Sequence, residues 1–285
     1  MIPTLVFDIE TIPDAGGLRS AWGIDAGLSD AEVIEVALEH RREKTGGSDF
    51  LPLHLHRVVA IACLMRDARG FRVKCLGTPE DGEGKLIQQF FSLIDRFTPQ
   101  LVSWNGGGFD LQVLHYRGLI HGAQAPRYWE TGDDDRDFKW NNYLSRYHTR
   151  HLDLMDQLAL FTPRANAPLD ELAKLCGFPG KLGMDGSQVW PAFREGRIGE
   201  IRDYCETDVA NTWLMFARFQ LMRGLLSPDT HAAEVAALRE TLAALAEGGA
   251  AHWREFLAAW PQSRLQSQPQ PQPPSQARSS SPSRS

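Results

Sequence analysis

The order of the short apolar runs in the first 120 residues is the feature that most limits the folds open to this chain. Three runs rich in β-branched residues and bounded by turn residues predict strands: TLVFDIE (4–10), RVVAIACLM (57–65) and FRVKCLG (71–77). A turn at 67–70 joins the last two, so the sheet should start antiparallel. Apolar spacing then predicts a helix over 80–97, a buried strand over 101–105 and a helix over 109–120. This βββαβα order favours an α/β domain with a mixed central sheet flanked by helices.

Helices are expected to dominate the second half of the chain. Apolar periodicity predicts them over 151–160, 168–176 and 198–223. Ser227-Pro228 then starts a further helix, and Gly248-Gly249 separates it from a last helical run that ends at Trp260. We interpret both late segments as packing helices. The segment 29–46 reads as a capped amphipathic helix with a charged outer face, which either covers the entrance of a site or simply packs.

Composition indicates an ordinary soluble globular protein. The chain has 285 residues, of which 42% are hydrophobic and 23% charged. No stretch approaches the roughly 18 to 20 apolar residues that a membrane span needs, and the first dozen residues contain acids rather than a basic head. The four cysteines form no CxxC and no His-paired spacing, so we expect buried free thiols and no zinc or redox motif. The expected location is cytoplasmic, without membrane contact.

The expected organisation has three parts. Residues 1–226 form the α/β domain, with insertions at about 14–56 and 127–151. Residues 227–261 form a C-terminal helical extension that packs on it. Residues 262–285 consist almost wholly of Gln, Pro, Ser and Arg, which bury too little apolar surface to offset ordering entropy, and are expected to be disordered.

The folded part of the chain is acidic. The formal net charge is −6, but residues 262–285 hold three arginines and no acid, so residues 1–261 carry −9. Proteins that bind nucleic acid through charge neutralisation alone are usually basic. If nucleic acid is the substrate, metal ions or a local basic patch must offset the repulsion of phosphate.

Asp8 and Glu10 stand two residues apart at the end of the first predicted strand, so their side chains point to the same face of the sheet. Without a cation, the two carboxylates would raise each other's pKa. A hard divalent ion would stabilise both as anions. The alternative is a strand that runs into a polar turn.

The run NGGGFD, from Asn105 to Asp110, lies where a predicted strand meets a predicted helix. Its glycines allow a sharp turn or a close approach of backbone to a ligand, and Asp110 can equally cap the helix. The run lacks the Lys-Ser/Thr of a P-loop and the spacing of GxGxxG. Taken alone, it leaves both interpretations open.

Tyr204 and Asp208 lie four residues apart in the helix predicted over 198–223, so the phenol and the carboxylate share one face. The pair can therefore reach one point in space. The alternative is a solvated helix acid beside a half-buried core tyrosine.

The segment 127–151 interleaves aromatic and cationic side chains. Such a mixture suits sequence-tolerant binding of single strands by stacking and charge. A subunit contact or a loop anchored on the core would use the same composition, and the sequence leaves these possibilities open.

Together and in this order, DIE, NGGGFD and YCETD resemble the three motifs DxE, Nx(2,3)(F/Y)D and YxxxD of the DEDD superfamily of 3′ to 5′ exonucleases. The chain is most similar to the bacterial predicted 3′ to 5′ exonucleases related to the exonuclease domain of B-family DNA polymerases. FDIETIPD, SWNGGGFDLQVL, RHLDLMDQLA, GMDGSQVW and IRDYCETDVANT extend the likeness over about residues 1–223. The resemblance implies a ribonuclease H-like (DnaQ-like) fold.

The resemblance also implies roles for particular residues. Four acids would hold two divalent ions per site, Mg²⁺ or Mn²⁺: Asp8, Glu10, Asp110 and Asp208. Tyr204 would be the fifth catalytic residue. The histidine subtype has His five residues before the last acid, where this chain has Asp203, so the tyrosine subtype (DEDDy) is implied. Beside the terminal nucleotide would lie the substrate-binding residues Thr11, Trp104, Asn105 and Phe109.

The expected function is therefore a metal-dependent 3′ to 5′ exonuclease that acts on single-stranded 3′ ends, with DNA favoured, and releases nucleoside 5′-monophosphates. Two alternatives remain from the sequence. One is an exoribonuclease with the same site, and the other is a non-catalytic nucleic-acid-binding or polymerase-accessory module. The chain shows no polymerase domain, so a proofreading role would require a polymerase or repair partner of unknown identity.

Overall fold

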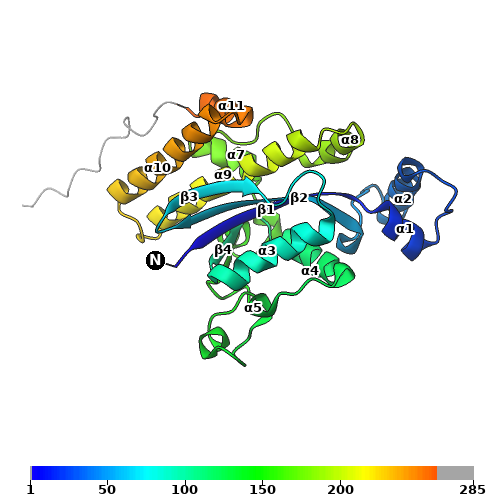
Figure 1. Cartoon of the computed structure of the whole chain (residues 1–285), viewed down its shortest axis with the longest axis horizontal. Coiled ribbons are helices and arrows are strands. Elements are labelled where there is room, and N and C mark those ends of the chain that lie inside the picture. The colour runs from blue at the N-terminus through cyan, green and yellow to red at the C-terminus, as the bar shows by residue number, and fades with distance from the viewer. Residues whose placement is uncertain (1, 262–285) are drawn as a thin grey trace, which may run out of the picture.

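A five-stranded mixed sheet organises the molecule, in the order β3-β2-β1-β4-β5 (Figure 1). The computed structural model describes residues 2–261. Its strands are β1 (Thr4–Pro13), β2 (His56–Asp67), β3 (Gly70–Cys75), β4 (Gln100–Ser103) and β5 (His151–Asp153). β1 pairs antiparallel with β2, which pairs antiparallel with β3, whereas β4 runs parallel to β1 and to β5. The predicted antiparallel start and the α/β class with a mixed sheet are confirmed.

β1 lies at the centre of the sheet and separates two apolar cores. Leu5, Phe7 and Ile9 face the core beneath the helices α3 (Glu83–Phe97) and α4 (Asp110–His121). Val6 belongs to the opposite core, with side chains of α9 (Ile198–Met222). Because side chains alternate along a strand, Asp8 and Glu10 continue the Val6 face and point toward α9.

Shorter and later helices complete the α9 side of the sheet. These are α7 (Leu169–Leu175), α8 (Val189–Arg194), α10 (Pro228–Glu247) and α11 (Ala251–Ala259). Arg66 of β2 forms a paired set of hydrogen bonds with Glu234 of α10, with N–O distances of 2.9 and 2.6 Å. This contact joins α10 to β2, and Trp253 and Phe256 of α11 lie in the core that also contains side chains of α9.

The prediction of one helix over 151–160 was wrong. Residues His151–Asp153 form the edge strand β5, and the helix α6 covers only Leu154–Leu158. Asp153 ends the strand and caps the helix by accepting hydrogen bonds from the backbone N–H groups of Met155 and Asp156. A strand of three residues is too short to show its two-residue period, so the sequence could not reveal it. The helix α8 and the first helix of the 14–56 insertion were also not predicted.

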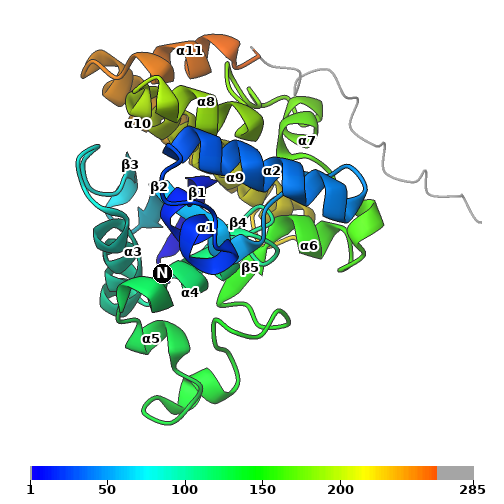
Figure 2. The same cartoon turned by 90° about the vertical axis from the view of Figure 1, so that its right-hand side faces the viewer.

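The 14–56 insertion forms a compact helical unit beyond the end of β1 (Figures 1 and 2). α1 (Ala15–Trp22) and α2 (Asp30–Thr45) enclose a small core of their own. The predicted capped helix is present, and Ser29 and Glu32 form a capping box at the start of α2. Asp14 at the base of the insertion pairs with the buried Arg117 of α4 at 2.5 Å. This contact fixes the unit to α4.

The 127–151 segment is anchored mainly on the core. Tyr128, Phe138 and Tyr143 are buried, and the guanidinium of Arg150 lies 3.8 Å from the centre of the Phe138 ring. These residues support the interpretation of an anchored loop. Trp140 remains 78% exposed and is not part of this packing. The segment includes α5 (Pro126–Trp129) and a short 3₁₀ turn (Arg136–Lys139).

Three further expectations concern the C-terminal segment, membrane crossing and the cysteines. The proposed tail, 262–285, lies outside the described residues. None of the helices within residues 2–261 combines the length and apolar character that a membrane crossing requires. All four cysteines are free, as predicted, but Cys205 lies beside Asp8 rather than in an inert part of the core.

Candidate active site

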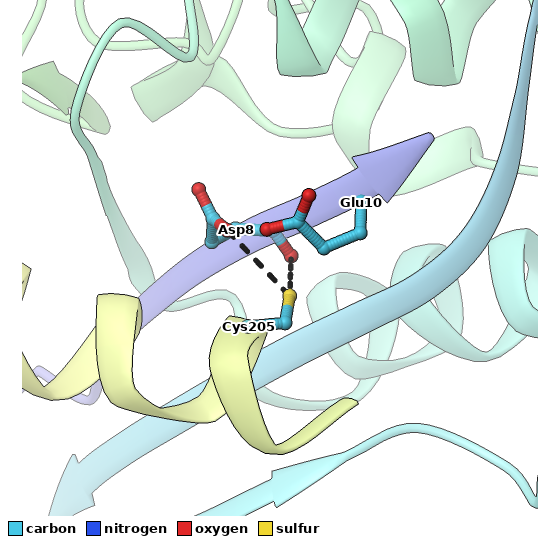
Figure 3. A group of neighbouring side chains, drawn as sticks. All are labelled: Asp8, Glu10 and Cys205. Carbon is cyan, nitrogen blue, oxygen red and sulfur yellow. Dashed lines mark hydrogen bonds between the residues drawn. The ribbon is translucent and has the colours of Figure 1, made fainter. Parts of the chain in front are cut away.

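Asp8 and Glu10 place two carboxylates on the same face of the central strand. Figure 3 shows them from β1, next to the thiol of Cys205 on α9. Ligand atoms of Asp8, Glu10 and Cys205 all lie within 4.8 Å of one another. Glu10 is buried and Asp8 is half-buried. The interpretation of DIE as a strand entering a solvated turn is therefore wrong, because the strand continues to Pro13.

Asp110 joins this pair from the other side of the strand. It is the first residue of α4, it is buried, and its Oδ1 accepts a hydrogen bond of 3.1 Å from the backbone N–H of Ile9. Ile9 stands between Asp8 and Glu10, so this bond fixes the start of α4 to the acidic end of β1. The partial positive charge of a helix N-terminus also favours a carboxylate there.

The loop before Asp110 is held by a second carboxylate. Asp153 accepts hydrogen bonds from the backbone N–H groups of Asn105 at 3.0 Å and Gly107 at 2.8 Å. Asn105 has a left-handed backbone with φ of 68°, a conformation that asparagine tolerates better than most residues. A Cβ at Gly106 would collide with the Ser103 side chain, so glycine is required there. Asp153 therefore shapes the loop that precedes Asp110.

Tyr204 and Asp208 reach the same centre from α9. Both are buried, which excludes a solvated acid at position 208. Cys205, one residue after Tyr204, points its Sγ to Oδ2 of Asp8 at 3.5 Å. Burial raises the pKa of the Cys205 thiol well above its usual range, so the group is a neutral hydrogen-bond donor. YCETD thus supplies three side chains to the centre.

Lys181 is the residue that sequence reasoning missed. Its ammonium lies 2.6 Å from Oδ2 of Asp208 and 2.5 Å from the Tyr204 hydroxyl. Burial lowers the pKa of Lys181, but the nearby Asp208, Tyr204 and Asp8 outweigh this effect and raise it above the usual range. Lys181 therefore stays charged and neutralises part of the acidic centre. No motif marks this lysine, because its loop is remote in sequence from all three acidic motifs.

The loop that carries Lys181 is fixed to α9. Asn211, one turn beyond Asp208, accepts a hydrogen bond from the Gly180 N–H at 3.1 Å and donates one to the Gly180 carbonyl at 2.8 Å. Asp170 accepts from the Lys181 N–H at 2.7 Å. Gly180 has a φ of 73°, which a residue with a side chain rarely adopts. The position of the Lys181 ammonium therefore follows from α7 and α9 together.

Burial raises the pKa of all four carboxylates, and neighbouring acids add to the effect. Burial raises the pKa of Asp8 well above its usual range, and the neighbouring Asp110 and Asp208 raise it further. Burial and the charge of Asp8 act on Glu10 in the same direction. Burial also raises the pKa of Asp110, to about 7, and that of Asp208 in spite of Lys181. Without added positive charge, this centre retains protons near neutral pH.

These residues fit divalent cations. Two carboxylates of β1 lie close together, Asp110 and Asp208 are near enough to act on Asp8 electrostatically, and the raised pKa values show the cost of this charge. Among the described residues, Oδ1 of Asp208 is buried and has no hydrogen-bond partner. A buried carboxylate oxygen without a partner is costly, and a cation would satisfy it.

The four predicted substrate-binding residues surround the loop and the end of β1. The Thr11 hydroxyl lies 3.0 Å from Nδ1 of His56, and the Phe109 ring packs edge-on against His56 with centroids 5.3 Å apart. Trp104 donates its indole N–H to the Ala167 carbonyl at 3.2 Å. Asn105 accepts hydrogen bonds through its backbone carbonyl from Gly108 and Phe109, so its observed part is to shape the loop.

A cavity of about 590 Å³ borders Tyr204. Acidic side chains from α9 and α11 line it, among them Glu200, Asp203 and Glu255, with Arg197 on the same wall. This cavity extends the negative charge of the centre outward. A phosphate would enter it only against repulsion, unless cations are present.

The fold and the centre define a class: an α/β protein with a mixed sheet and a buried carboxylate centre at the end of its central strand. The sequence matches, over residues 48–260, the family described as "Predicted 3'-5' exonuclease related to the exonuclease domain of PolB". The chain belongs to this family. Asp110, Tyr204 and Asp208 lie within the matched residues, whereas Asp8 and Glu10 precede them. No curated protein matches the chain.

Among solved structures, the chain is similar to the family B DNA polymerase from the hyperthermophilic archaeon Pyrobaculum calidifontis. The sequences are 17% identical and the TM-score is 0.46, over 78% of this chain and 25% of that chain. The chain thus spans about a quarter of the polymerase's length.

Proposed function

We propose that this protein is a metal-dependent 3′ to 5′ exonuclease of the tyrosine subtype of the DEDD superfamily, built on a ribonuclease H-like fold. One observation carries the proposal. Ligand atoms of Asp8 and Glu10 on β1 lie within 4.8 Å of the Cys205 thiol on α9, and Asp110 of α4 is bonded to the backbone of Ile9 between the two acids. Asp208 of α9, up to 200 residues away in sequence, is near enough to raise the pKa of Asp8 and Glu10. Membership in a family of predicted 3′ to 5′ exonucleases supports the same reaction.

Asp8, Glu10, Asp110 and Asp208 are the residues that would hold two Mg²⁺ or Mn²⁺ ions. When bound, such a pair supplies an activated water and stabilises the leaving 3′ oxygen during displacement at phosphorus. The protein's own contribution is to hold the carboxylates in place before the ions arrive. The Ile9 N–H does this for Asp110, and the Cys205 thiol does it for Asp8.

Tyr204 acts as a donor that orients the reacting groups rather than as a base. Burial and the neighbouring Asp208 and Glu10 raise the pKa of Tyr204 above its usual value, so the phenol keeps its proton at neutral pH. Lys181 holds the phenol oxygen and supplies a positive charge beside it. A charge in that position also suits a phosphate oxygen of the scissile bond.

The substrate we propose is a single-stranded 3′ end, with DNA favoured, from which nucleoside 5′-monophosphates are released. Phe109 and the Asn105 loop stand directly before Asp110 and would lie against the terminal nucleotide. A paired end would first have to melt, at a cost of about 1.4 kcal/mol per base-pair step. An exoribonuclease would use the same acids, and no described contact is specific for a 2′-hydroxyl.

We propose further that residues 1–226 are the exonuclease domain and that 227–261 is a helical extension of it. The insertions at 14–56 and 127–151 distinguish the domain from a minimal nuclease. Any role in proofreading or repair would require a partner chain that carries the polymerase or repair activity.

Matched DNA and RNA oligomers, each labelled at the 5′ end, test the proposal with Mg²⁺, Mn²⁺ or a chelator. We expect a descending ladder on single-stranded DNA, slower attack on blunt duplex and on 3′-phosphate ends, and no product in chelator. Closed single-stranded circles should survive. Cleavage of circles, or shortening from the 5′ end, would contradict the mechanism. Faster cleavage of RNA than of DNA would identify RNA, rather than DNA, as the substrate.

A further inference from the structure

A second cavity, of about 350 Å³, lies on the 14–56 insertion, away from the four carboxylates. Its size falls within the range of small-molecule sites, at the lower end. Its lining is aromatic and basic: Trp22, His40, Arg41, Lys44, Pro52 and His54. The Trp22 and His40 rings meet edge-on with centroids 5.5 Å apart. We call this cavity the insertion pocket.

The charge of the insertion pocket is opposite to that of the rest of the domain. Residues 40–57 contain four Arg and Lys side chains and two acidic ones, whereas residues 1–261 carry −9. No acid among the described residues pairs with Arg41 or Lys44; Arg41 donates only to the Phe50 carbonyl, at 2.8 Å. Arg42, between them, is instead paired with Glu39 and Asp49. Two cations of the pocket are therefore free to meet an anion.

A row of rings connects the insertion pocket to the carboxylate centre. The Phe109 ring, next to Asp110, lies 5.3 Å from His56 and 6.0 Å from Phe50, measured between centroids. Phe50 is 53% exposed and lies two residues before Pro52, which lines the pocket. One exposed ring and two half-buried rings, followed by unpaired cations, are groups that a sequence-tolerant single-strand path can use.

The scaffold of the pocket is fixed rather than loose. α1 and α2 share a core that includes Leu18 and Val33, and Asp14 is tied to Arg117. Figure 2 shows α2 crossing in front of the end of the sheet from which β1 emerges. A strand that leaves the carboxylate centre past Phe109 would meet this unit first.

We propose that the insertion pocket binds a nucleotide upstream of the cleaved 3′ end, with its phosphate at Arg41 and Lys44 and its base against Trp22 and His40. This inference rests on the proposed function, because it takes the substrate to be a single strand. The pocket thereby adds local positive charge to an acidic domain. It sets affinity for longer strands and takes no part in the chemical step.

Lys44→Gln is the cleanest test, because Lys44 is exposed and has no described hydrogen-bond partner. Arg42→Gln is the matched control: it removes the same charge from the same helix but from a side chain that does not line the pocket. Affinity for 5′-labelled oligo(dT) of about 12 nucleotides is measured by fluorescence anisotropy in Ca²⁺, and steady-state cleavage in Mg²⁺. Arg41→Gln and the double variant follow.

For Lys44→Gln we expect about three- to tenfold weaker binding of the long oligomer, with unchanged kcat and unchanged cleavage of a dinucleotide. The dependence of log affinity on log salt should become shallower by about 0.7 per lost contact. Arg42→Gln should resemble wild type. The pocket would be refuted as an upstream site if Lys44→Gln and Arg42→Gln lost affinity for the long oligomer equally. It would also be refuted if Lys44→Gln weakened cleavage of the dinucleotide as much as binding of the long oligomer.

Competition distinguishes a strand site from a mononucleotide site. Thymidine monophosphate at about 1 mM should not displace the oligomer more readily from wild type than from Lys44→Gln. A mononucleotide makes only one of the contacts that a strand makes, so it should bind the pocket weakly. Selective displacement from wild type would mean that the pocket holds the free product instead. If no variant or wild type cleaves any strand, the proposed function fails, whereas the anisotropy comparison still decides the pocket.

Discussion

The carboxylate centre repels a phosphate unless cations are bound, whereas the insertion pocket attracts one. The centre gathers buried acids whose pKa values are raised by burial and mutual repulsion, and Lys181 is the cation among them. The insertion pocket has no acid in its lining and exposes Lys44 to solvent. One region requires cations before a phosphate can approach, and the other is itself cationic.

The difference follows from burial. In a buried site a misplaced charge is expensive, so each acid is held by defined partners and its removal should be severe. In an exposed pocket water and salt screen each charge, so any one side chain contributes little. Substitutions in the centre should therefore act on kcat, whereas substitutions in the pocket should act on affinity and on its salt dependence.

The strongest challenge to this contrast is removal of an acid. We expect Asp8→Ala or Asp208→Ala to lower turnover at least about a thousandfold, or roughly 4 kcal/mol, in a protein that remains folded. Single-turnover cleavage of a short oligomer measures the effect, with circular dichroism as the check on folding. Glu171→Ala, an exposed acid of α7, is the control and should leave turnover unchanged. Near-normal activity in Asp8→Ala would end the proposed role of the centre.

Lys181→Met should be the next most damaging change, with a loss of about a hundred- to a thousandfold in kcat. It leaves the Asp208 carboxylate without its cation and the Tyr204 hydroxyl without its partner. Because Lys181 lowers the pKa of Asp208, the pH–rate profile of the variant should also shift to higher pH. Lys74→Met on β3 removes an exposed lysine as control. An unshifted profile would show that Lys181 is not coupled to Asp208.

Tyr204→Phe should cost about ten- to a thousandfold in kcat, because it removes a positioning hydroxyl but keeps the ring in the core. KM for a long oligomer should stay unchanged. The measurement is steady-state cleavage between pH 6 and 9. A variant that equals wild type across this range would require the role of Tyr204 to be abandoned.

Divalent metal ions should offset the loss of folding stability that the metal-free protein shows as the pH rises. The pKa of Asp110 rises from an ordinary 3.8 to about 7 on folding, so the folded protein binds more protons between these values. Stability of the metal-free protein from this source is present at low pH and declines as the pH rises from about 4 to 7. Divalent ions replace those protons, so Mg²⁺ should raise the Tm by several degrees more at pH 8 than at pH 5. Equal shifts, measured by scanning calorimetry, would mean that the ion does not bind these carboxylates.

The smallest expected effect is the coupling between the two regions. Lys44→Gln and Tyr204→Phe share no described partner, so the losses in the double variant should multiply, with a coupling below about 0.5 kcal/mol. The check is kcat/KM on a long oligomer for both single variants and the double. A larger coupling would show that the insertion pocket also positions the reacting end.

Much of the architecture followed from periodicity. The strands around β1, the helices α3, α4 and α9, and the capped helix α2 were all predicted with boundaries within a few residues. The two-residue spacing of Asp8 and Glu10 and the four-residue spacing of Tyr204 and Asp208 correctly placed each pair on one face. These features depend on neighbours in sequence, and local spacing is what a sequence records directly.

The tertiary structure decided what depends on distant neighbours. Residues His151–Asp153 form the edge strand β5 instead of the predicted helix, because pairing with β4 outweighs the local helical preference of a three-residue segment. The tertiary structure also brought Lys181 to Asp208 through Asn211, and Cys205 to Asp8 through the packing of α9 on β1. The sequence determined the acids and the faces that carry them; which charges neutralise one another depends on through-space distance, and the fold alone sets that distance.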